Sequence, residues 1–554
     1  MSTIMKLESL PNEIFIECFQ YLDTLDILYS FDRLNYRFHL LIQNISLHLN
    51  LHHYKKSSFD QFYEIILTNS EIKQYIISLQ LSNVYAHEQI KSFIPILLLN
   101  EFIYFRSLSL IELKDDNTKQ VLPILSFLSD IECFFCTSLQ YRNSKIRRLK
   151  DCNFNINSIF IYNAMSITSL TICNCDLFDL CELFKYIPML KKLHIGYFHN
   201  SKINDDDLNL NNIYILNLKQ LMIDYSEANF QALQILLKYI PNLKILSIYA
   251  PNNMEMADAD RWQHLIESSL IHLHIFKFIF GYYAIDPRPK ILKKLEEFRT
   301  DFWIKQHQWY TNYEINESLV SIYTMPYIGY EYRLTPTMNK YVNSLINHSN
   351  GFNNVKNITV WLKPIIKNLY YFNNIQSLTL TCEDDDDDDD DDDDQIDEYI
   401  LSEKQIKFLH MTVNLSNIKH LIIDDECCMT PSLLLKILIQ SPCLSELTIE
   451  NNILTLYLKN SQICELLNKN IIKLDISDDN RNIYIKSNDI DSFYSASNCQ
   501  EDRCYMRLDN LLLILSKCRK LSIIILGKIR QDIYSWIQIN ASTLNIDFYF
   551  TLID

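Results

Sequence analysis

Closely spaced cysteines could bind a metal ion. Cys133 and Cys136 form a C-x-x-C pair, but no second close pair accompanies them. A structural zinc site needs four ligands. Cys173, Cys175 and Cys181 flank an expected strand and the helix after it, again without a nearby pair of histidines. The sequence therefore predicts no metal site and no cofactor.

Histidines and carboxylates form no recognisable catalytic pattern. His272 and His274 bracket Leu273, so we expect both to point away from the face that carries that leucine. The carboxylate pairs Asp205–Asp207 and Asp424–Glu426 lie at expected strand ends or loops, where charged groups are ordinarily solvated. We predict no catalytic residue and no enzymatic activity. An enzyme with a site dispersed along the chain is the alternative.

Glycine is scarce, and its scarcity restricts the chemistry further. The chain has 5 glycines in 554 residues, and each stands alone, whereas average usage is about 7%. Phosphate-binding loops and nucleophile elbows need glycines at fixed spacings. The sequence therefore disfavours P-loop NTPases, protein kinases, Rossmann dehydrogenases and elbow-type hydrolases. A bias towards A/T-rich codons would also explain the low count.

The charge distribution gives no broad basic surface. The net charge is −17, and eleven of the negative charges lie in the run Asp384–Asp394, which leaves −6 for the rest of the chain. The local cluster Lys145, Arg147, Arg148 and Lys150 fits a solvated edge. We therefore predict that nucleic acid is not a partner.

The chain shows no sign of export or of insertion into a membrane. The N-terminal residues lack the apolar core and cleavage site of a signal peptide. No apolar run approaches the ~18 residues that a membrane span needs. We expect a cytoplasmic or nuclear protein, or both, whose fifteen cysteines are mostly buried thiols.

The first forty residues have the spacing of short amphipathic helices. Ile14, Cys18, Phe19 and Leu22 fall on one predicted helical face, and Pro11 fits the first helical turn. Such a small unit cannot bury its apolar stripes alone. A helical partner is therefore expected.

A motif in these helices resembles an F-box. It reads L-P-x-E-I from Leu10, then F-x-x-L-D from Phe19, then D-I-L from Asp26. The family often has a tryptophan near the position of Phe38. The resemblance implies a three-helix unit that binds a Skp-type adaptor and, through it, a cullin. The adaptor-facing positions that it implies are Leu10, Pro11, Ile14, Phe19, Leu22, Ile27 and Leu28. An ordinary amphipathic hairpin is the alternative.

From about residue 70 a phrase recurs in which leucine and isoleucine alternate, often after a proline. Examples are YIPMLKKLHI, YIPNLKILSI and QSPCLSELTI. Leucines that we take as equivalent recur at spacings of 23, 28, 25 and 27 residues, and later at 26 and 27. These spacings lie in the range of leucine-rich repeats. The equivalent leucines are Leu170, Leu193, Leu221, Leu246 and Leu273, followed later by Leu421, Leu447 and Leu474.

Each repeat combines a short strand with a helix. The alternating L-x-I predicts a strand with one apolar face, and segments such as NFQALQILLKYIP have helical spacing. Thr430 before Pro431 is a good helix start. We predict an α/β fold, an irregular solenoid that resembles leucine-rich repeats, with parallel strands and with helices on its convex side. A doubly wound α/β domain is the alternative.

Two stretches interrupt the repeats. Residues 281–350 are rich in tryptophan and tyrosine, which suits either a partner surface or a plug packed on the solenoid. Residues 383–398 carry the aspartate run and are expected to form a disordered loop. This loop would either attract a basic partner or be a tolerated expansion.

These features predict an organisation and a function. We expect an F-box in residues 1–50, repeats in 51–280 and 351–554, and the aromatic-rich insertion 281–350 between them. The F-box resemblance implies the substrate receptor of an SCF-type ubiquitin ligase, with an unknown protein target bound by the repeats. A protein-interaction scaffold that is not coupled to ubiquitination is the alternative.

Overall fold

A computed structural model gives the structure of the chain. It describes residues 10–552 except 33, 52–58, 61, 65, 67–69, 84–88, 98–101, 112–132, 137–166, 186, 201–214, 284–286, 317–318, 336–338, 343–350, 363–369, 382–397, 425–426, 428, 477–507, 530 and 545. The aspartate run, the basic cluster at 145–150 and the carboxylates at 205–207 lie outside the described residues.

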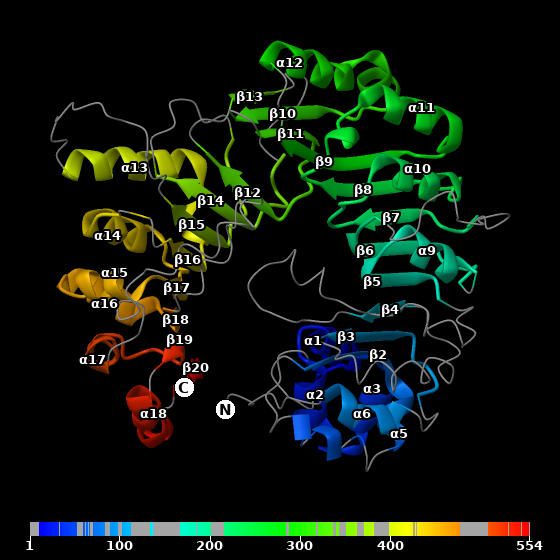
Figure 1. Ribbon diagram of the computed structural model, residues 1–554. Coiled ribbons are helices and arrows are strands. Elements are labelled where there is room, and N and C mark those ends of the chain that lie inside the picture. Colours follow the sequence, from blue (N-terminus) through cyan, green and yellow to red (C-terminus); the bar gives the residue numbers. More distant parts are fainter. Residues whose placement is uncertain are drawn as a thin grey trace. The chain divides into compact units, whose positions relative to one another are not determined.

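The chain is a mixed α/β protein that divides into two compact units. Unit 1 comprises residues 1–282 and 288–307, and unit 2 comprises residues 283–287 and 308–554. The division falls inside the aromatic-rich stretch 281–350. Both units contain a parallel sheet with its strands in chain order (Figure 1).

Unit 1 begins with three short helices and continues with alternating strands and helices. The N-terminal helices are α1 (Asn12–Phe19), α2 (Thr24–Phe31) and α3 (Tyr36–Gln43). The strands are β1 (Leu47–Asn50), β2 (Ile76–Ser82), β3 (Ser107–Ile111), β4 (Cys133–Cys136), β5 (Ser169–Cys175), β6 (Lys192–Phe198), β7 (Gln220–Ile223), β8 (Ile245–Ala250) and β9 (Ile275–Tyr283). The helices among and after them are α5 (Ser70–Tyr75), α6 (Gln89–Leu97), α9 (Leu177–Phe184), α10 (Phe230–Lys238), α11 (Ala259–Ser269) and α12 (Arg288–Glu296).

Side-chain caps define where the N-terminal helices begin. Asp23 accepts a hydrogen bond from the amide of Leu25 (2.9 Å) at the start of α2, and Asn35 accepts one from the amide of Phe38 (3.0 Å) at the start of α3. Helix α1 begins at Asn12, so Pro11 stands just before the helix, in extended conformation, and not in its first turn. An N-cap residue keeps an extended backbone, which the fixed φ of proline also allows.

Equivalent leucines of unit 1 lie side by side in the sheet. Leu170 of β5 is paired with Leu193 of β6, Leu193 with Leu221 of β7, and Leu221 with Leu246 of β8. All four are at most 1% exposed. The leucines that recur at the predicted repeat period are therefore the residues that pair across neighbouring strands of this sheet.

The fifth expected leucine is placed differently. Leu246 is paired with Phe276, and Leu273 lies before β9 begins. The repeated phrase contains two leucines three residues apart, and Leu273 corresponds to the first of them, as Leu243 does in the preceding repeat. The prediction for Leu273 was wrong because the two positions look alike in sequence.

The turns before strands β6 to β9 repeat one hydrogen-bond pattern. Two consecutive amides donate to a single carbonyl of the preceding repeat, as the amides of Lys219 and Gln220 do to Lys191. Asparagines in these turns add a side-chain bond: Asn217 donates to the carbonyl of Pro188 (2.8 Å) and Asn242 to that of Leu216 (2.9 Å). Unit 2 repeats this bond with Asn354, Asn374 and Asn417.

Unit 2 combines an antiparallel three-stranded ribbon with a parallel sheet. The ribbon consists of β10 (Thr311–Asn316), β11 (Leu319–Thr324) and β13 (Asn339–Tyr341), with β10 in the middle. The parallel strands are β12 (Glu331–Leu334), β14 (Asn357–Trp361), β15 (Ser377–Thr381), β16 (His420–Ile423), β17 (Glu446–Thr448), β18 (Lys473–Asp475), β19 (Ile523–Ile529) and β20 (Asp547–Leu552).

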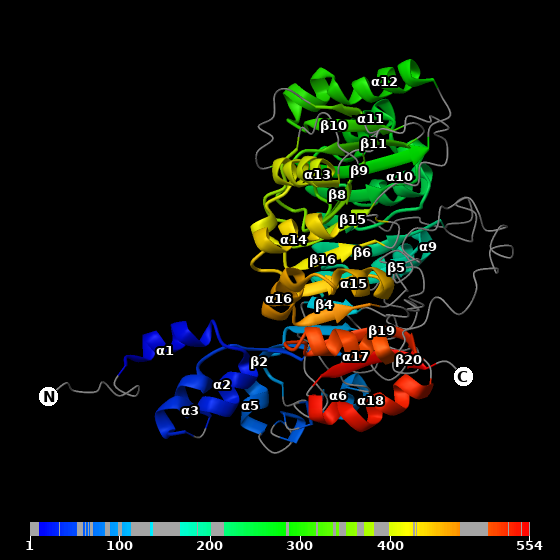
Figure 2. The same ribbon diagram turned by 90° about the vertical axis from the view of Figure 1, so that its left-hand side faces the viewer.

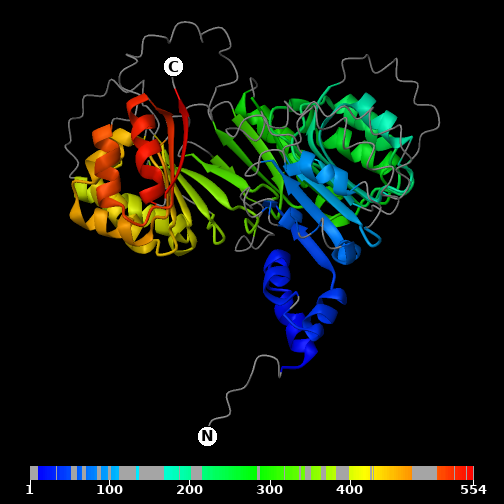
Figure 3. The same cartoon turned by 90° about the horizontal axis from the view of Figure 1, so that it is seen from below.

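Helices lie along one face of the unit 2 sheet (Figures 2 and 3). Leu421, Leu447 and Leu474 are paired in register across β16, β17 and β18 and are at most 2% exposed. Thr430 caps α14 through the amide of Leu433 (3.2 Å), as predicted. The helices are α13 (Glu398–Thr412), α14 (Pro431–Gln440), α15 (Asn451–Tyr457), α16 (Ser461–Asn470), α17 (Leu508–Lys517) and α18 (Gln531–Leu544).

The aromatic side chains of residues 281–350 are mostly interior. Tyr283 is 56% exposed and Tyr330 is 63% exposed, whereas the buried ones include Tyr282, Phe298, Phe302, Trp303, Trp309, Tyr313, Tyr323, Tyr327 and Tyr332. Trp303 packs against Phe298 at 4.8 Å between ring centroids in unit 1, and Tyr323 packs against Tyr327 at 5.0 Å in unit 2. These aromatics therefore form core, which favours the packing alternative over an exposed partner surface.

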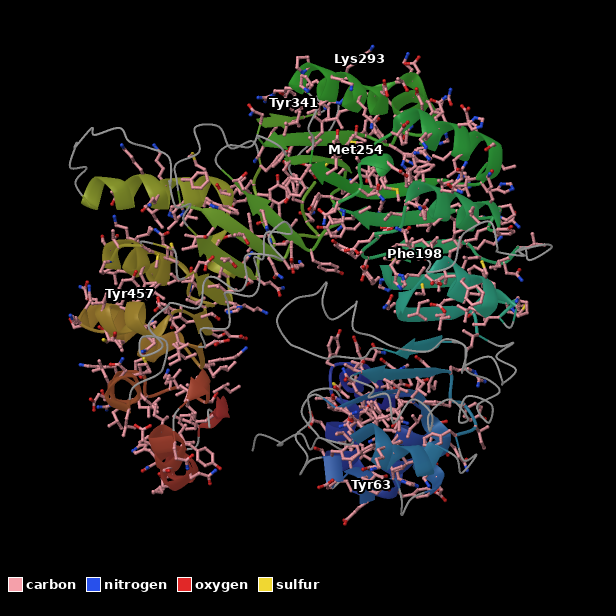
Figure 4. All side chains as sticks on the ribbon, viewed as in Figure 1. Tyr63, Phe198, Met254, Lys293, Tyr341 and Tyr457 are labelled. Atoms are coloured by element: carbon pink, nitrogen blue, oxygen red, sulfur yellow. The ribbon has the colours of Figure 1, made fainter. Side chains whose placement is uncertain are left out.

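Trp262 of α11 gives a test of the unit 1 core. It is fully buried, packs on Phe230 and Phe276, and donates its indole N–H to the carbonyl of Met256 (2.9 Å). We expect Trp262→Ala to lower the free energy of unfolding by about 3–5 kcal/mol, measured by urea unfolding with circular dichroism. Met254→Ala is the control, because Met254 is 53% exposed (Figure 4). Equal loss in both variants would contradict the packing.

Candidate functional site

The seven predicted adaptor-facing residues divide into a surface group and a core group. Pro11 is exposed, Ile14 is 41% exposed and Leu22 is 40% exposed, and Leu10 is half-buried. The other three, Phe19, Ile27 and Leu28, are each at most 4% exposed. The first group can contact a partner directly, whereas the second can only support that surface from below.

A cluster of phenylalanine rings forms the core beneath this surface. Phe15 meets Phe38 edge to face at 4.8 Å between ring centroids, and Phe19 meets Phe31 at 5.0 Å. Phe31 also lies 5.3 Å from Phe38. The rings join α1, α2 and α3, so Phe38 is a core residue of the three-helix unit.

Arg37 of α3 connects the start of α1 to the third helix. Its Nε donates to Oδ1 of Asn12 at 2.8 Å, and its guanidinium also donates to the carbonyl of Leu10. The guanidinium lies 5.5 Å from the ring centroid of Phe15. Arg37 therefore positions the Leu10–Pro11 turn. The sequence analysis did not predict a role for Phe15, because the spacing of apolar residues on α1 fits two faces. It did not predict one for Arg37, because the partners of Arg37 lie 25 and 27 residues away in the sequence.

The three-helix unit exposes more apolar surface than its own core requires. Among the described residues, eight large apolar side chains between positions 14 and 40 are at least 36% exposed. Several exposed apolar side chains on one small helical unit are typical of an interaction site. The eight are Ile14, Ile16, Tyr21, Leu22, Tyr29, Leu34, Tyr36 and Leu40.

In unit 2, strands β16 to β18 carry polar side chains opposite the buried leucines, and these side chains bond to one another. Nε2 of His420 lies 2.8 Å from Oγ1 of Thr448, and Nζ of Lys473 lies 2.7 Å from Oε2 of Glu446. Burial lowers the pKa of His420, although Glu446 opposes that shift. These residues occupy alternate strand positions, where side chains leave the core face.

A buried polar cluster joins the ribbon of unit 2 to its parallel sheet. Glu314 of β10 is 3% exposed, and it accepts hydrogen bonds from the hydroxyl groups of Tyr323 (2.8 Å) and Tyr332. The hydroxyl groups of Tyr323 and Tyr370 lie 3.1 Å apart. Lys340 of β13 is paired with Glu314 in the ribbon. The members of the cluster are spread between positions 314 and 370, so no local sequence motif predicts it.

The ionisation of this cluster follows from its burial. Burial raises the pKa of the Glu314 carboxyl, while Lys340 and the tyrosine hydroxyl groups oppose the shift. Burial also lowers the pKa of Lys340 to about 8, opposed by Glu314. The four members Glu314, Tyr323, Tyr332 and Tyr370 are at most 5% exposed. The arrangement can share protons internally, and its side chains are closed to a bulky substrate.

Four of the seven cysteines whose side chains the structure describes are buried, namely Cys175, Cys181, Cys427 and Cys518, whereas Cys18 and Cys443 are exposed. Burial raises the pKa of Cys175, with Asp179 and Asp176 adding to the shift, and raises that of Cys518 to about 12. Neither thiol is therefore activated as a nucleophile. Across the described part of the chain, no three His, Cys, Asp or Glu side chains are grouped as metal ligands would be.

Comparisons with known proteins add little. No family model matches the chain, and no curated protein matches it. One solved structure that it resembles is the crystal structure of a Rad7 and Elc1 complex in yeast, at 11% sequence identity and a TM-score of 0.28, covering 80% of this chain and 84% of that one. A likeness this weak supports no argument about fold or function. None of the helices among the described residues is long and apolar enough to cross a membrane.

Lys340 gives a test of the buried cluster. Because its pKa falls to about 8 from an ordinary 10.5, the unfolded chain binds more protons than the folded chain between those values. Stability should therefore rise as the pH rises from about 8 toward 10. We expect Lys340→Met to lose that rise, measured as the thermal midpoint against pH.

The control for this test is Lys293→Met, which removes an exposed lysine of α12 (Figure 4). It should keep the pH dependence of the wild-type protein. The same slope in Lys340→Met and in the wild-type protein would contradict the assignment of this pH dependence to the half-buried Lys340.

Proposed function

We propose that the chain is the substrate receptor of an SCF-type ubiquitin ligase. In this proposal, helices α1 to α3 bind a Skp-type adaptor and, through it, a cullin. The two parallel sheets with their turns bind a protein target. The chain performs no chemistry itself. It raises the effective concentration of the target near the ligase.

The observation that carries the proposal is the exposed apolar surface of the N-terminal helices. The positions that resemble the F-box motif include exposed Pro11, Ile14 and Leu22. A partner that covers these side chains would remove apolar area from water, and full burial of a leucine or isoleucine is worth about 1.5–3 kcal/mol. Phe19, Ile27 and Leu28 support the proposal indirectly, as the core that holds the surface.

The proposed target-binding part is leucine-rich-repeat-like. Support comes from the register of equivalent leucines, from the pair of amides that recurs before strands β6 to β9 and β14 to β19, and from the turn asparagines. Stacked repeats give long surfaces suited to protein ligands. A recognition role also fits the shortage of glycine loops, and we propose a location in the cytoplasm, the nucleus or both.

Two exposed residues test adaptor binding without disturbing the core. We expect Ile14→Asp with Leu22→Asp to weaken binding of a purified Skp-type adaptor by about 30-fold or more, equal to about 2 kcal/mol. The charges would be buried without partners in the complex. Binding is measured by calorimetry on the full chain.

The matched control is Leu544→Asp, because Leu544 of α18 is 39% exposed, close to the values of Ile14 and Leu22. It should leave adaptor binding unchanged. Failure of the wild-type chain to bind the adaptor would refute the proposed function. Binding of the adaptor without recruitment of a cullin would favour a scaffold that is not coupled to ubiquitination.

A further inference from the structure

A row of basic side chains runs along the edge of the unit 1 sheet where strands β6 to β9 begin. Lys191, Lys219, Lys244 and His274 each stand immediately before one of these strands, and all four are exposed. Their backbones are joined directly: the amide of Lys219 donates to the carbonyl of Lys191 (2.8 Å), Lys244 to Lys219 (2.8 Å), and His274 to Lys244 (3.0 Å). These bonds hold the row at the strand spacing of about 4.8 Å.

The three lysines of this basic row have no carboxylate in their own turns. The turns that carry it, residues 187–192, 215–220, 240–245 and 270–275, contain no Asp or Glu. Within the described part of the chain, no ion pair involves any of the three lysines. Like charges held at this spacing repel one another. An anionic ligand across the row would relieve that repulsion.

The helix ends at this edge do not account for the row. A basic residue in the last helical turn suits the helix dipole, and in α10 that place is already taken by Lys238. Lys244 follows six residues later, beyond the turn where the dipole acts.

Exposed apolar side chains flank the basic row in the same turns. Met189 is 46% exposed, Leu216 is 56% exposed and Ile271 is 72% exposed. Each precedes its basic residue by two or three positions. The edge therefore presents a basic row beside an aliphatic row.

The fold itself does not require this charge. The same hydrogen-bonded position before each of strands β14 to β19 of unit 2 is held by residues of mixed type, of which only two are basic. In chain order these are Lys356, Gln376, Lys419, Ser445, Ile472 and Ser522. The concentration of lysine is confined to the positions before strands β6 to β8 of unit 1.

We infer that the basic row of unit 1 binds an acidic segment of a protein, with apolar residues between its carboxylates. The inference rests on the proposed function, because it assigns the segment to the target that the chain recruits. Carboxylates would face the lysines, and apolar side chains would cover Met189, Leu216 and Ile271. A nucleic acid fits less well, since single strands are bound by stacking on aromatic rings and the exposed side chains beside the row, Met189, Leu216 and Ile271, are not aromatic.

The probe is a short fluorescein-labelled peptide of alternating aspartate and leucine, titrated with the full chain by fluorescence anisotropy. We expect saturable binding that weakens as salt is raised. Lys191→Glu, Lys219→Glu and Lys244→Glu combined should weaken it by about tenfold or more. The matched control is Lys356→Glu with Lys419→Glu, at the equivalent positions of unit 2, and it should change affinity by less than about twofold.

Several results would overturn the inference. They are unaltered binding in the triple variant, equal binding of a peptide of alternating asparagine and leucine, or tighter binding of oligothymidylate than of the acidic peptide. Adaptor binding is measured on the same proteins. A triple variant that loses the peptide but keeps the adaptor supports the inference. A wild-type chain that binds the adaptor but not the peptide overturns the inference alone and leaves the proposed function standing.

Discussion

A single repeat of this chain cannot bury its own leucines, and this need for a neighbour governs both units. A strand such as Gln220–Ile223 is short and presents its leucine and isoleucine on one face only. Pairing with the next strand places leucine beside leucine, and the turn bonds fix that register without glycine. The residues on the opposite strand face and in the turns are not needed to form this leucine core, so their types can vary with function.

The N-terminal helices meet the same constraint in a different way. Their phenylalanine core is complete, with Phe15 and Phe38 in contact, yet Ile14 and Leu22 remain about two-fifths exposed. In the repeats, the chain supplies the cover for its own apolar surface. In the N-terminal helices the apolar surface stays exposed. We therefore propose that a partner buries it, and adaptor binding is the basis of the proposed function.

Much of this architecture could be predicted from the sequence. The repeated phrase contains both the alternating residues of the strand and the proline that ends the helix before it. The helices around Phe230–Lys238 and Pro431–Gln440 and the register of the leucines followed from it. Leu273 was misassigned because the phrase offers two leucines. The split of the α1 residues into exposed and buried could not be predicted, since α1 is apolar on both faces. Nor could the Glu314 cluster, whose members come together only through long-range pairing.

Hydrogen–deuterium exchange of the full chain with and without a Skp-type adaptor tests the central claim most directly. The method follows protection of backbone amides along the whole molecule and needs no variant. Our account predicts slower exchange in the peptides that cover α1 and α2, with the amides of the parallel sheets unchanged. No protection in α1 and α2 at saturating adaptor, or protection confined to the sheets, would contradict it.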